Sequence, residues 1–517
     1  MTAPLRLENC SETDVTRFAQ VLAFSVQPGD IVCLSGDLGA GKTTLARAAI
    51  QALLDDDNCE IPSPTYTLVQ TYDAARFSIA HFDLYRLGAP EELDELGLDY
   101  ALTSGIALLE WPEQAQDLIP PAAFHIYLSE QANNHEQRSI TLTGQDRSRV
   151  SRLMALHKLL QENAWPPTAQ LRYLQGDASV RRYARLAQPS DSEPRTSAIV
   201  MDWAEQPDGP PVRDGLPYSQ IAHLAENIKP FLGVTSALRE IGLSAPKIFS
   251  ADIENGFVVL EDFGGDVFQT AILAGEDPRH RYRAAVEVLV TLRQNPPPET
   301  LAIPGGQTPY QLPNYDLGAF GIETELLTDW YFPAILNNAI TDCERETFTT
   351  AWRGHLETLS DQPSGWVLRD FHSPNLISLP NRKGVKAVGL IDVQDALRGP
   401  LAYDLVSLLQ DARVDIAQDV ESELLDAYCA AACSSDRTFD EALFRLSYAI
   451  AGAQRNTKIL GIFARLAVRD GKPGYLRHLP RIWGYLARNL AHPELADLKA
   501  WYDGHFPVER RSASLNI

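Results

Sequence analysis

The first 150 residues alternate short apolar runs with segments whose apolar positions follow helical spacing. Residues 30–35 read as a buried strand, and a helical pattern follows through residue 54. Upstream, Ser11 precedes a helix whose apolar face holds Val15 and Phe18. Further strand-like runs lie at 67–72, 78–82, 106–110, 124–128 and 139–143. Strands alternating with helices predict an α/β sheet.

The pattern changes after residue 146. A helical stretch over 146–167 is interpreted as a linker helix because it ends at Trp165-Pro166-Pro167. Strands are then expected at 170–174, 181–186, 198–201, 248–250 and 257–260, helices at 219–228 and 231–241, and a mobile Pro/Gly-rich segment at 207–217. Beyond Gly264 the pattern is mainly helical. We therefore predict an α/β domain over 1–150, a linker helix over 151–167, and a second domain over 168–517 with a strand-rich small lobe and a helical large lobe.

Composition and charge restrict the kinds of partner. The 517 residues carry a net charge of −23, and the first 150 hold 9 Lys and Arg against 22 Asp and Glu. Nucleic-acid binding needs clustered basic residues, so we expect this domain not to bind nucleic acid directly. No apolar run approaches the roughly 20 residues that cross a bilayer, and the start lacks signal-peptide features. Six cysteines without CxxC pairs indicate a reduced, cytoplasmic compartment.

A complete P-loop pattern follows the strand at 30–35. The sequence from Gly36 to Thr43 matches GxxxxGK[ST] between a strand and a helix, where backbone N–H groups and the helix N-terminus can hold phosphates. Lys42 is expected to reach the β- and γ-phosphates of ATP, and the Thr43 hydroxyl to ligate Mg²⁺. The expected phosphate-binding residues are Gly36, Leu38, Gly39, Ala40, Gly41, Lys42, Thr43 and Thr44.

Three further motifs accompany the P-loop. They are Ser63-Pro64-Thr65-Tyr66-Thr67-Leu68-Val69, His81-Phe82-Asp83-Leu84-Tyr85-Arg86-Leu87 and Leu109-Glu110-Trp111-Pro112-Glu113. Together with the P-loop, over about residues 5–145, they resemble the TsaE family, the ATPase subunit of the bacterial complex that makes N6-threonylcarbamoyladenosine in tRNA. The resemblance implies that Asp83 and Glu110 shape the metal and water site, and that the ATPase acts through partner subunits. Asp83 as a helix cap and Trp111 as plain packing are the alternatives.

A second phosphate motif lies near the C-terminus. Asp370 and Asn375 reproduce the kinase spacing D-x-x-x-x-N, and Asp392 ends the apolar run at 388–391. Asp370 is placed to accept the proton of an attacking hydroxyl, while Asn375 and Asp392 are placed to ligate Mg²⁺. The Phe-Gly that follows the metal-binding aspartate in protein kinases is absent here. The two motifs therefore predict two separate ATP sites.

The remainder of the large lobe narrows the second family. Segments 389–396, 399–409, 454–466 and 469–472 resemble the anomeric kinases of N-acetylmuramate and N-acetylglucosamine, within the aminoglycoside phosphotransferase family. The resemblance covers about residues 168–505 and implies a bilobal protein-kinase-like α+β fold, with a small amino sugar as substrate. Arg455, Asn456 and Lys458 could face the sugar or its lactyl carboxylate. The alternative for these three is a solvated helix face or salt bridges to Asp470.

The small lobe departs from the protein-kinase pattern. The segment 176–179 offers one glycine where a glycine-rich loop is expected, and Met201 stands near the place of the ATP-binding lysine. Arg181 is a candidate for the missing positive charge, and Glu261 opens the expected hinge at the adenine. Two alternatives stay open: a kinase for an aminoglycoside, choline or another alcohol, and a degenerate kinase that serves as a binding module.

Overall fold

The computed structural model describes residues 4–115, 117–131, 134–163, 169–174, 181–187, 197–306, 308–336, 339–507 and 511, with the backbone alone at 335 and 336. The chain forms two compact units. The first holds Met1–Ala204 with Ile248–Asp262, and the second holds Glu205–Lys247 with Phe263–Ile517. The sequence predicts an α/β P-loop domain followed by a kinase-like α+β domain, and this fold class is confirmed.

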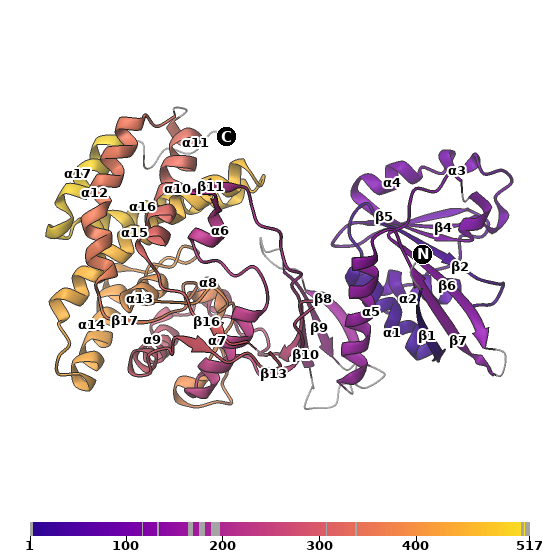
Figure 1. Cartoon of the computed structure of the whole chain (residues 1–517), viewed down its shortest axis with the longest axis horizontal. Helices are drawn as coiled ribbons and strands as arrows, with labels where there is room; N and C mark the ends of the chain where they lie inside the picture. Colours follow the sequence, from indigo (N-terminus) through magenta and orange to yellow (C-terminus); the bar gives the residue numbers. More distant parts are fainter. Residues whose placement is uncertain are drawn as a thin grey trace. The chain divides into compact units, whose positions relative to one another are not determined.

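The first unit is built around a seven-stranded sheet with the order β1-β7-β6-β2-β5-β4-β3. Its elements are β1 (Leu5–Cys10), α1 (Glu12–Ser25), β2 (Ile31–Ser35), α2 (Lys42–Leu54), β3 (Val69–Asp73), β4 (Ser78–Asp83), α3 (Glu92–Glu95), α4 (Leu98–Ser104), β5 (Gly105–Glu110), β6 (Phe124–Gln131), β7 (Asn134–Thr143) and α5 (Arg147–Glu162). The central strands β4, β5, β2 and β6 run parallel (Figure 1).

Successive side chains of β2 point to opposite faces of this sheet, and different helices cover the two faces. Val32 and Leu34 belong to the core shared with α1, α2 and α5, whereas Ile31 and Cys33 belong to the core under α3 and α4. Buried parallel strands read as continuous apolar runs, which is why residues 31–34 and 106–109 were predictable. β1, in contrast, is an edge strand with mostly exposed or half-buried residues, and the sequence pattern did not predict it.

A five-stranded antiparallel sheet belongs to the same unit. Its order is β13-β14-β10-β9-β8. The strands are β8 (Gln170–Leu174), β9 (Arg182–Ala187), β10 (Ser197–Asp202), β13 (Ile248–Asp252) and β14 (Phe257–Glu261). All five lie close to the ranges expected for the small lobe.

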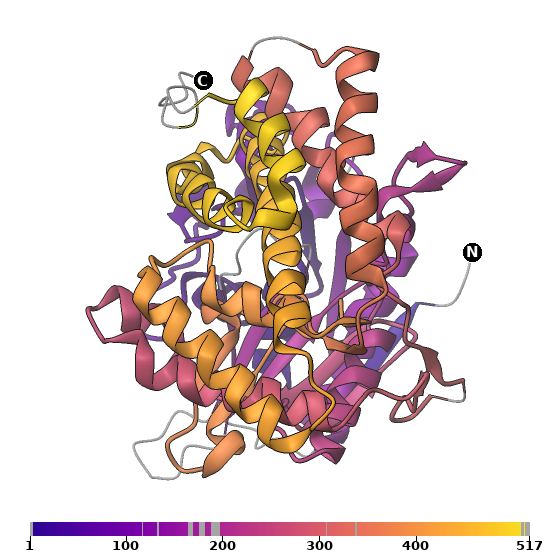
Figure 2. The same ribbon diagram turned by 90° about the vertical axis from the view of Figure 1, so that its left-hand side faces the viewer.

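The second unit is mainly helical. Its helices are α6 (Tyr218–Ile221), α7 (Lys229–Glu240), α8 (Phe268–Leu273), α9 (Pro278–Gln294), α10 (Leu317–Leu326), α11 (Phe332–Leu336), α12 (Asp342–Ser360), α13 (Ala402–Leu409), α14 (Gln418–Ser435), α15 (Glu441–Val468), α16 (Leu479–Leu490) and α17 (Ala496–His505). The long helix α15 packs against α10, α12, α13 and α16 (Figure 2). None of the helices in the described parts of the chain is long and apolar enough to cross a membrane.

Short antiparallel strand pairs flank the loops of the second unit. Its strands are β11 (Pro211–Arg213), β12 (Leu216–Pro217), β15 (Thr300–Leu301), β16 (Tyr310–Gln311), β17 (Ser364–Val367), β18 (Leu376–Ser378), β19 (Val388–Leu390) and β20 (Leu397–Pro400). The pairs β17–β20 and β18–β19 enclose the loop that carries Asp370. Residues 207–217, expected to be mobile, include the paired strands β11 and β12, and the helix expected at 219–228 is only α6.

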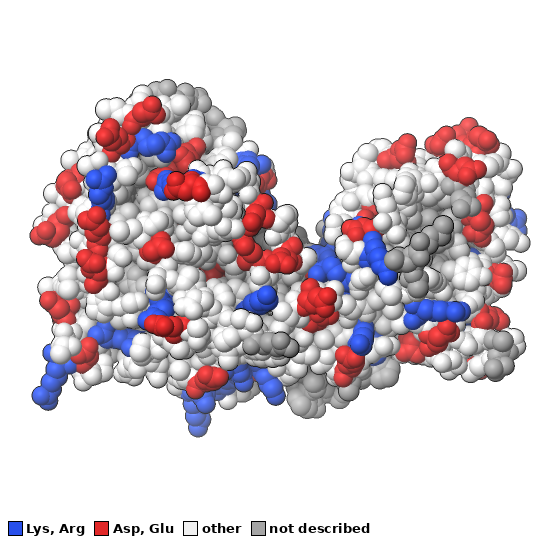
Figure 3. All heavy atoms as spheres, viewed as in Figure 1, with Lys and Arg blue, Asp and Glu red and all other residues white. Residues whose placement is uncertain are grey.

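The surface mixes both signs of charge. On the face drawn in Figure 3, Lys and Arg are interspersed with Asp and Glu. Around α3, four acidic residues (Glu91, Glu92, Asp94 and Glu95) are all exposed.

Candidate phosphate-transfer sites

The P-loop joins the end of β2 to the start of α2. Gly36, Gly39 and Gly41 all have positive φ, at 137°, 82° and 105°. A Cβ on Gly36 would lie 2.1 Å from the carbonyl oxygen of Leu128, so only glycine fits there. Gly41 caps α2 in the left-handed conformation, and Lys42, Thr43 and Thr44 form the first helical turn, where free N–H groups can bind anions.

The Lys42 side chain folds back onto the P-loop. Its Nζ donates to the carbonyl oxygens of Gly36 (2.7 Å) and Asp37 (2.9 Å) and lies 3.5 Å from the centre of the Trp111 ring. Burial lowers the pKa of Lys42, and the nearby Glu110 carboxylate opposes that shift. Trp111 thus packs on the ammonium and on Tyr85, at 5.0 Å between the ring centres of Trp111 and Tyr85.

Oxygen ligands gather beside the P-loop at the ends of two neighbouring strands. The Thr43 hydroxyl donates to Glu110 at 2.8 Å, and Glu110 also contacts buried His81 at 2.9 Å. Asp83 and Glu110 face each other in the β4–β5 register. Hydroxyl and carboxylate oxygens are the ligands that Mg²⁺ takes together with phosphate oxygens and water, so this donor set fits the metal.

Asp83 has two kinds of contact. One oxygen accepts from the backbone N–H of Tyr85 at 3.1 Å, which is the helix-cap role. The other accepts from the hydroxyls of Ser63 (2.8 Å) and Thr65 (2.7 Å). The Ser63-Pro64-Thr65 segment is therefore tied directly to Asp83, and a metal role for Asp83 stays a prediction.

Arg138 on β7 is a P-loop residue that sequence reasoning missed. Its guanidinium donates to the carbonyl oxygens of Ala40 (3.0 Å) and Gly39 (3.4 Å). Arg138 lies 98 residues from Ala40 in the sequence, in a strand with no motif around it, so only the β6–β7 pairing brings it to the loop. Beside the loop lies a pocket of about 500 Å³ lined by Gly36, Asp37, Trp111 and Tyr127 among others.

The Asp370 loop is held by two buried carboxylates. Asp404 on α13 accepts from the backbone N–H groups of Leu368 and Arg369, and Asp411 accepts from the N–H and hydroxyl of Ser373. Burial raises the pKa of Asp404 to about 7, while the two N–H donors oppose that shift. Asp404 therefore anchors the loop that carries Asp370.

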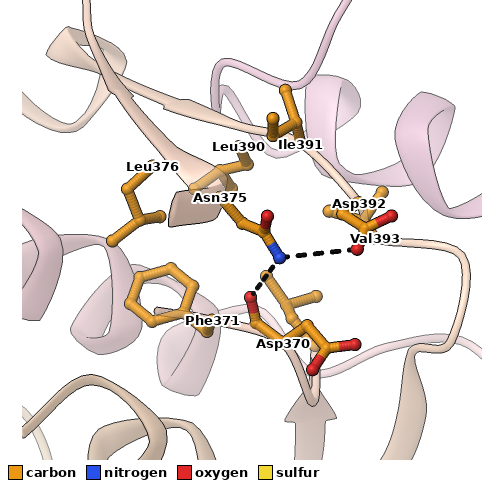
Figure 4. A pocket seen from close by; sticks show the side chains of 9 residues that line it. Asp370, Phe371, Asn375, Leu376, Leu390, Ile391, Asp392 and Val393 are labelled. Carbon is orange, nitrogen blue, oxygen red and sulfur yellow. Dashed lines mark hydrogen bonds between the residues drawn. The ribbon is translucent and has the colours of Figure 1, made fainter. Parts of the chain in front are cut away.

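Asp370, Asn375 and Asp392 line one small pocket (Figure 4). The Asn375 amide nitrogen donates to the backbone oxygen of Asp370 (3.1 Å) and lies 3.5 Å from the Asp392 carboxylate. The pocket is about 10 Å³, room for roughly one water or one small ion. An amide and a carboxylate from two neighbouring loops supply the oxygen donors that Mg²⁺ requires, so this set also fits the metal.

Asp370 is surrounded by positive charge. Burial acts to raise its pKa, but His372, Lys458 and Arg369 outweigh burial and hold the pKa of Asp370 well below its usual range. The His372 ring nitrogen lies 3.7 Å from the carboxylate. The Asp370 side chain is still 42 % exposed, so an approaching hydroxyl can reach it.

The three predicted sugar-binding residues on α15 have interior contacts. Arg455 donates to the Gln410 carbonyl (3.2 Å), and Asn456 donates to the Gln410 side chain (2.7 Å). Lys458 forms a 2.7 Å ion pair with buried Glu323. The solvated-face alternative is wrong for Arg455 and Asn456, which are 5 % and 0 % exposed. A sugar-binding role for the three stays a prediction, and Lys458 retains the most accessible side chain, at 14 %.

The small-lobe candidates belong to the first unit. The Arg181 guanidinium lies 5.1 Å from the Trp203 ring, and Glu261 pairs with Ala198 in the β10–β14 register. Met201 is buried. The segment 176–179 lies outside the described residues. Nucleotide contacts by Arg181 and Glu261 therefore stay predictions.

Comparison with known proteins divides the chain in the same way as its motifs. The model of the threonylcarbamoyl adenosine biosynthesis protein TsaE matches residues 9–140, and that of the phosphotransferase enzyme family matches residues 170–444. An N-acetylmuramate/N-acetylglucosamine kinase of Caulobacter vibrioides is 38 % identical, over 65 % of this chain and 92 % of its own length.

Other relatives agree with both assignments. A kinase of the same name from Pseudomonas aeruginosa is 32 % identical, over 64 % of this chain and 87 % of its own length. A tRNA threonylcarbamoyladenosine biosynthesis protein TsaE of Rickettsia conorii is 42 % identical, over 28 % of this chain and 82 % of its own length. The chain therefore belongs to two families at once, the TsaE family in its N-terminal part and the phosphotransferase enzyme family in the remainder.

Proposed function

We propose that the chain is a bifunctional ATP-dependent protein of the cytoplasm. Its N-terminal ATPase supports formation of N6-threonylcarbamoyladenosine in tRNA, and its C-terminal kinase phosphorylates the anomeric hydroxyl of N-acetylmuramate or N-acetylglucosamine in cell-wall recycling. The meeting of Asp370, Asn375 and Asp392 in one pocket is the observation that carries the kinase activity. The relatives that match each part supply the substrate class.

In the kinase, Asp370 is suited to be the proton acceptor. Its lowered pKa keeps it ionised at neutral pH, and the anomeric hydroxyl is more acidic than an ordinary alcohol, so a weak base suffices. The sugar hydroxyl oxygen forms a bond to the γ-phosphorus of ATP, and its proton passes to Asp370. The bond between the γ-phosphorus and the β–γ bridging oxygen breaks, and ADP leaves. Asn375 and Asp392 would hold Mg²⁺, which neutralises charge on the phosphates.

In the ATPase, the P-loop would hold the phosphates and Thr43 would ligate Mg²⁺. The Ser63 and Thr65 hydroxyls on Asp83 link the γ-phosphate region to the segment around exposed Tyr66. The acidic surface around α3 is unsuited to a polyanion, so partner subunits of the modification complex would bind the tRNA.

Substitution of Asp370 tests the kinase assignment. In purified full-length protein, Asp370→Asn should lower kcat for both amino sugars by about 10²–10⁴-fold, since proton acceptance is lost. Asp419→Asn, at an exposed carboxylate on α14, is the matched control and should leave the rate unchanged. Turnover of an aminoglycoside or choline, but of neither amino sugar, would contradict the substrate assignment. No turnover of any alcohol would support the binding-module alternative.

Lys458 is proposed to recognise the lactyl carboxylate that N-acetylmuramate has and N-acetylglucosamine lacks. Its ammonium has three N–H donors, one directed to Glu323, and its charge reaches Asp370. Lys458→Met should raise KM for N-acetylmuramate about tenfold, as expected for one charged hydrogen bond, and change KM for N-acetylglucosamine little. An equal loss with both sugars would mean that Lys458 only supports the catalytic loop through Glu323.

A further inference from the structure

The five-stranded sheet has one face that packs inside the first unit. Residues that alternate along β9, β10 and β14 belong to the same hydrophobic core as the helices α1 and α5. The sheet supplies Ala184, Leu186, Ala198, Val200, Phe257 and Val259, each at most 4 % exposed. From α1 and α5 come Phe18, Leu22, Phe24, Leu153 and Leu156, each at most 3 % exposed. One continuous core thus joins the ATPase to the strands of the small lobe.

A buried carboxylate ties the same elements together. Asp202, at the end of β10, is 4 % exposed and pairs with Arg152 of α5 and Arg182 of β9. Arg182 in turn donates to the carbonyl oxygens of Phe24 (3.3 Å) and Ser25 (3.4 Å) at the end of α1. Without α1 and α5, Asp202 would lose one cation and Arg182 two acceptors, which is costly for buried charges.

Further contacts extend the join to β8. The backbone N–H of Leu171 donates to the Gln20 side chain of α1 at 3.2 Å. Arg76 donates to the carbonyl oxygens of Ala23 and Val26, both at 2.8 Å, and its guanidinium lies 4.3 Å from the Tyr173 ring. At the far end, Arg172 pairs with Asp55 (3.3 Å) and Asp57 (3.2 Å) beyond α2.

We propose that this face of the five-stranded sheet is an interaction surface whose partner is the ATPase part of the same chain, and that the two unfold as one cooperative unit. The Caulobacter kinase and the Rickettsia conorii TsaE are each matched by one part of this chain, over 92 % and 82 % of their own lengths, so the fusion joins two modules that also match separate proteins. Because the two parts share an apolar core and buried ion pairs, local unfolding of one part exposes the core of the other and destabilises it. The stability of the kinase's small lobe therefore depends on residues of the ATPase.

Two arginines of α5 provide a matched test. Arg149 pairs with Asp30 at 2.6 Å and lies 5.1 Å from the Phe124 ring, all within the ATPase part, whereas Arg152 reaches Asp202 in the sheet. The test is amide hydrogen exchange of the full-length protein, measured by mass spectrometry. The exchange rate in β9 and β10 should rise about tenfold for Arg149→Ala as well as for Arg152→Ala, because either change removes an ion pair from the same cooperative unit. Arg445→Ala, which breaks an ion pair in the second unit, should leave β9 and β10 unchanged.

The reverse direction is tested from the sheet. Val200→Ala in β10 should increase exchange in β2 and β6 as well as in β9. If Arg149→Ala accelerates exchange only within residues 5–162, or Val200→Ala only within the five-stranded sheet, the proposal is overturned.

A measurement on the unaltered chain covers the case in which a variant fails to fold. With increasing urea, the slowest amides of β6 and of β10 should converge on one opening reaction with a common urea dependence. Two separate opening reactions would equally overturn the proposal.

Discussion

Glu323 is the buried carboxylate that pairs with two cations near the Asp370 loop, Arg369 and Lys458. It is fully buried and accepts from Arg369, Lys458, Tyr315 and Gln454. Burial acts to raise its pKa, but Arg369 and Lys458 outweigh burial and lower the pKa to about 2. Because Arg369 directly precedes Asp370, Glu323 positions the Asp370 loop through its ion pair with Arg369.

This shift predicts an acid-sensitive contribution to stability. A folded pKa of about 2 against an ordinary 4.5 means that the contribution is present above pH 4.5 and is lost as the pH falls through 2. Each pKa unit corresponds to about 1.4 kcal/mol, so the total is on the order of 3 kcal/mol. We expect Tm to fall more steeply from pH 5 to pH 3 in the natural protein than in Glu323→Gln, which is less stable at pH 7. Parallel Tm profiles would contradict this assignment.

At the scale of elements, the P-loop depends on a strand outside its motif. Arg138→Ala should raise KM for ATP hydrolysis at least tenfold. One hydrogen bond from a charged donor contributes roughly 1.5–3 kcal/mol, which alone corresponds to that factor, and the carbonyls of Gly39 and Ala40 both lose such a bond. Hydrolysis is measured without sugar, so that the kinase does not contribute. Arg6→Ala, at an exposed ion pair on β1, is the control. An unchanged KM for Arg138→Ala would mean that the loop holds its shape alone.

Local sequence determined some of these elements and tertiary pairing determined the others. The P-loop was predictable because its glycines and Lys42 are contiguous and follow a buried strand, and Asp370 and Asn375 because their spacing lies within one loop. Arg138, Glu323 and the Asp202 ion pairs were not predictable, since each acts through residues that only the folded chain brings close. The packing of the five-stranded sheet against α1 and α5 was also not predictable, because α5 has the sequence of an ordinary amphipathic helix whichever elements it packs against.

At the scale of the whole molecule, the two activities should be chemically separate although their folds are joined. Lys42→Ala should abolish ATP hydrolysis, and the variant should fail to restore N6-threonylcarbamoyladenosine when it replaces a cell's own ATPase subunit, as measured by mass spectrometry of tRNA. Phosphorylation of N-acetylglucosamine by the same variant at 25 °C should stay within twofold, since Lys42 lies in the ATPase part, against the P-loop carbonyls of Gly36 and Asp37 and the Trp111 ring. Loss of both activities would contradict the two-site arrangement.

The ion pairs of Asp202 also have a genetic consequence. One polypeptide fixes the two enzymes at equal copy number, and a common core exposes both to the same proteases when either opens. A destabilising mutation in the ATPase part would then lower the cellular amount of the sugar kinase too. Strains selected for a defect in tRNA modification would show slower reuse of wall sugars, although the kinase gene segment itself is unaltered.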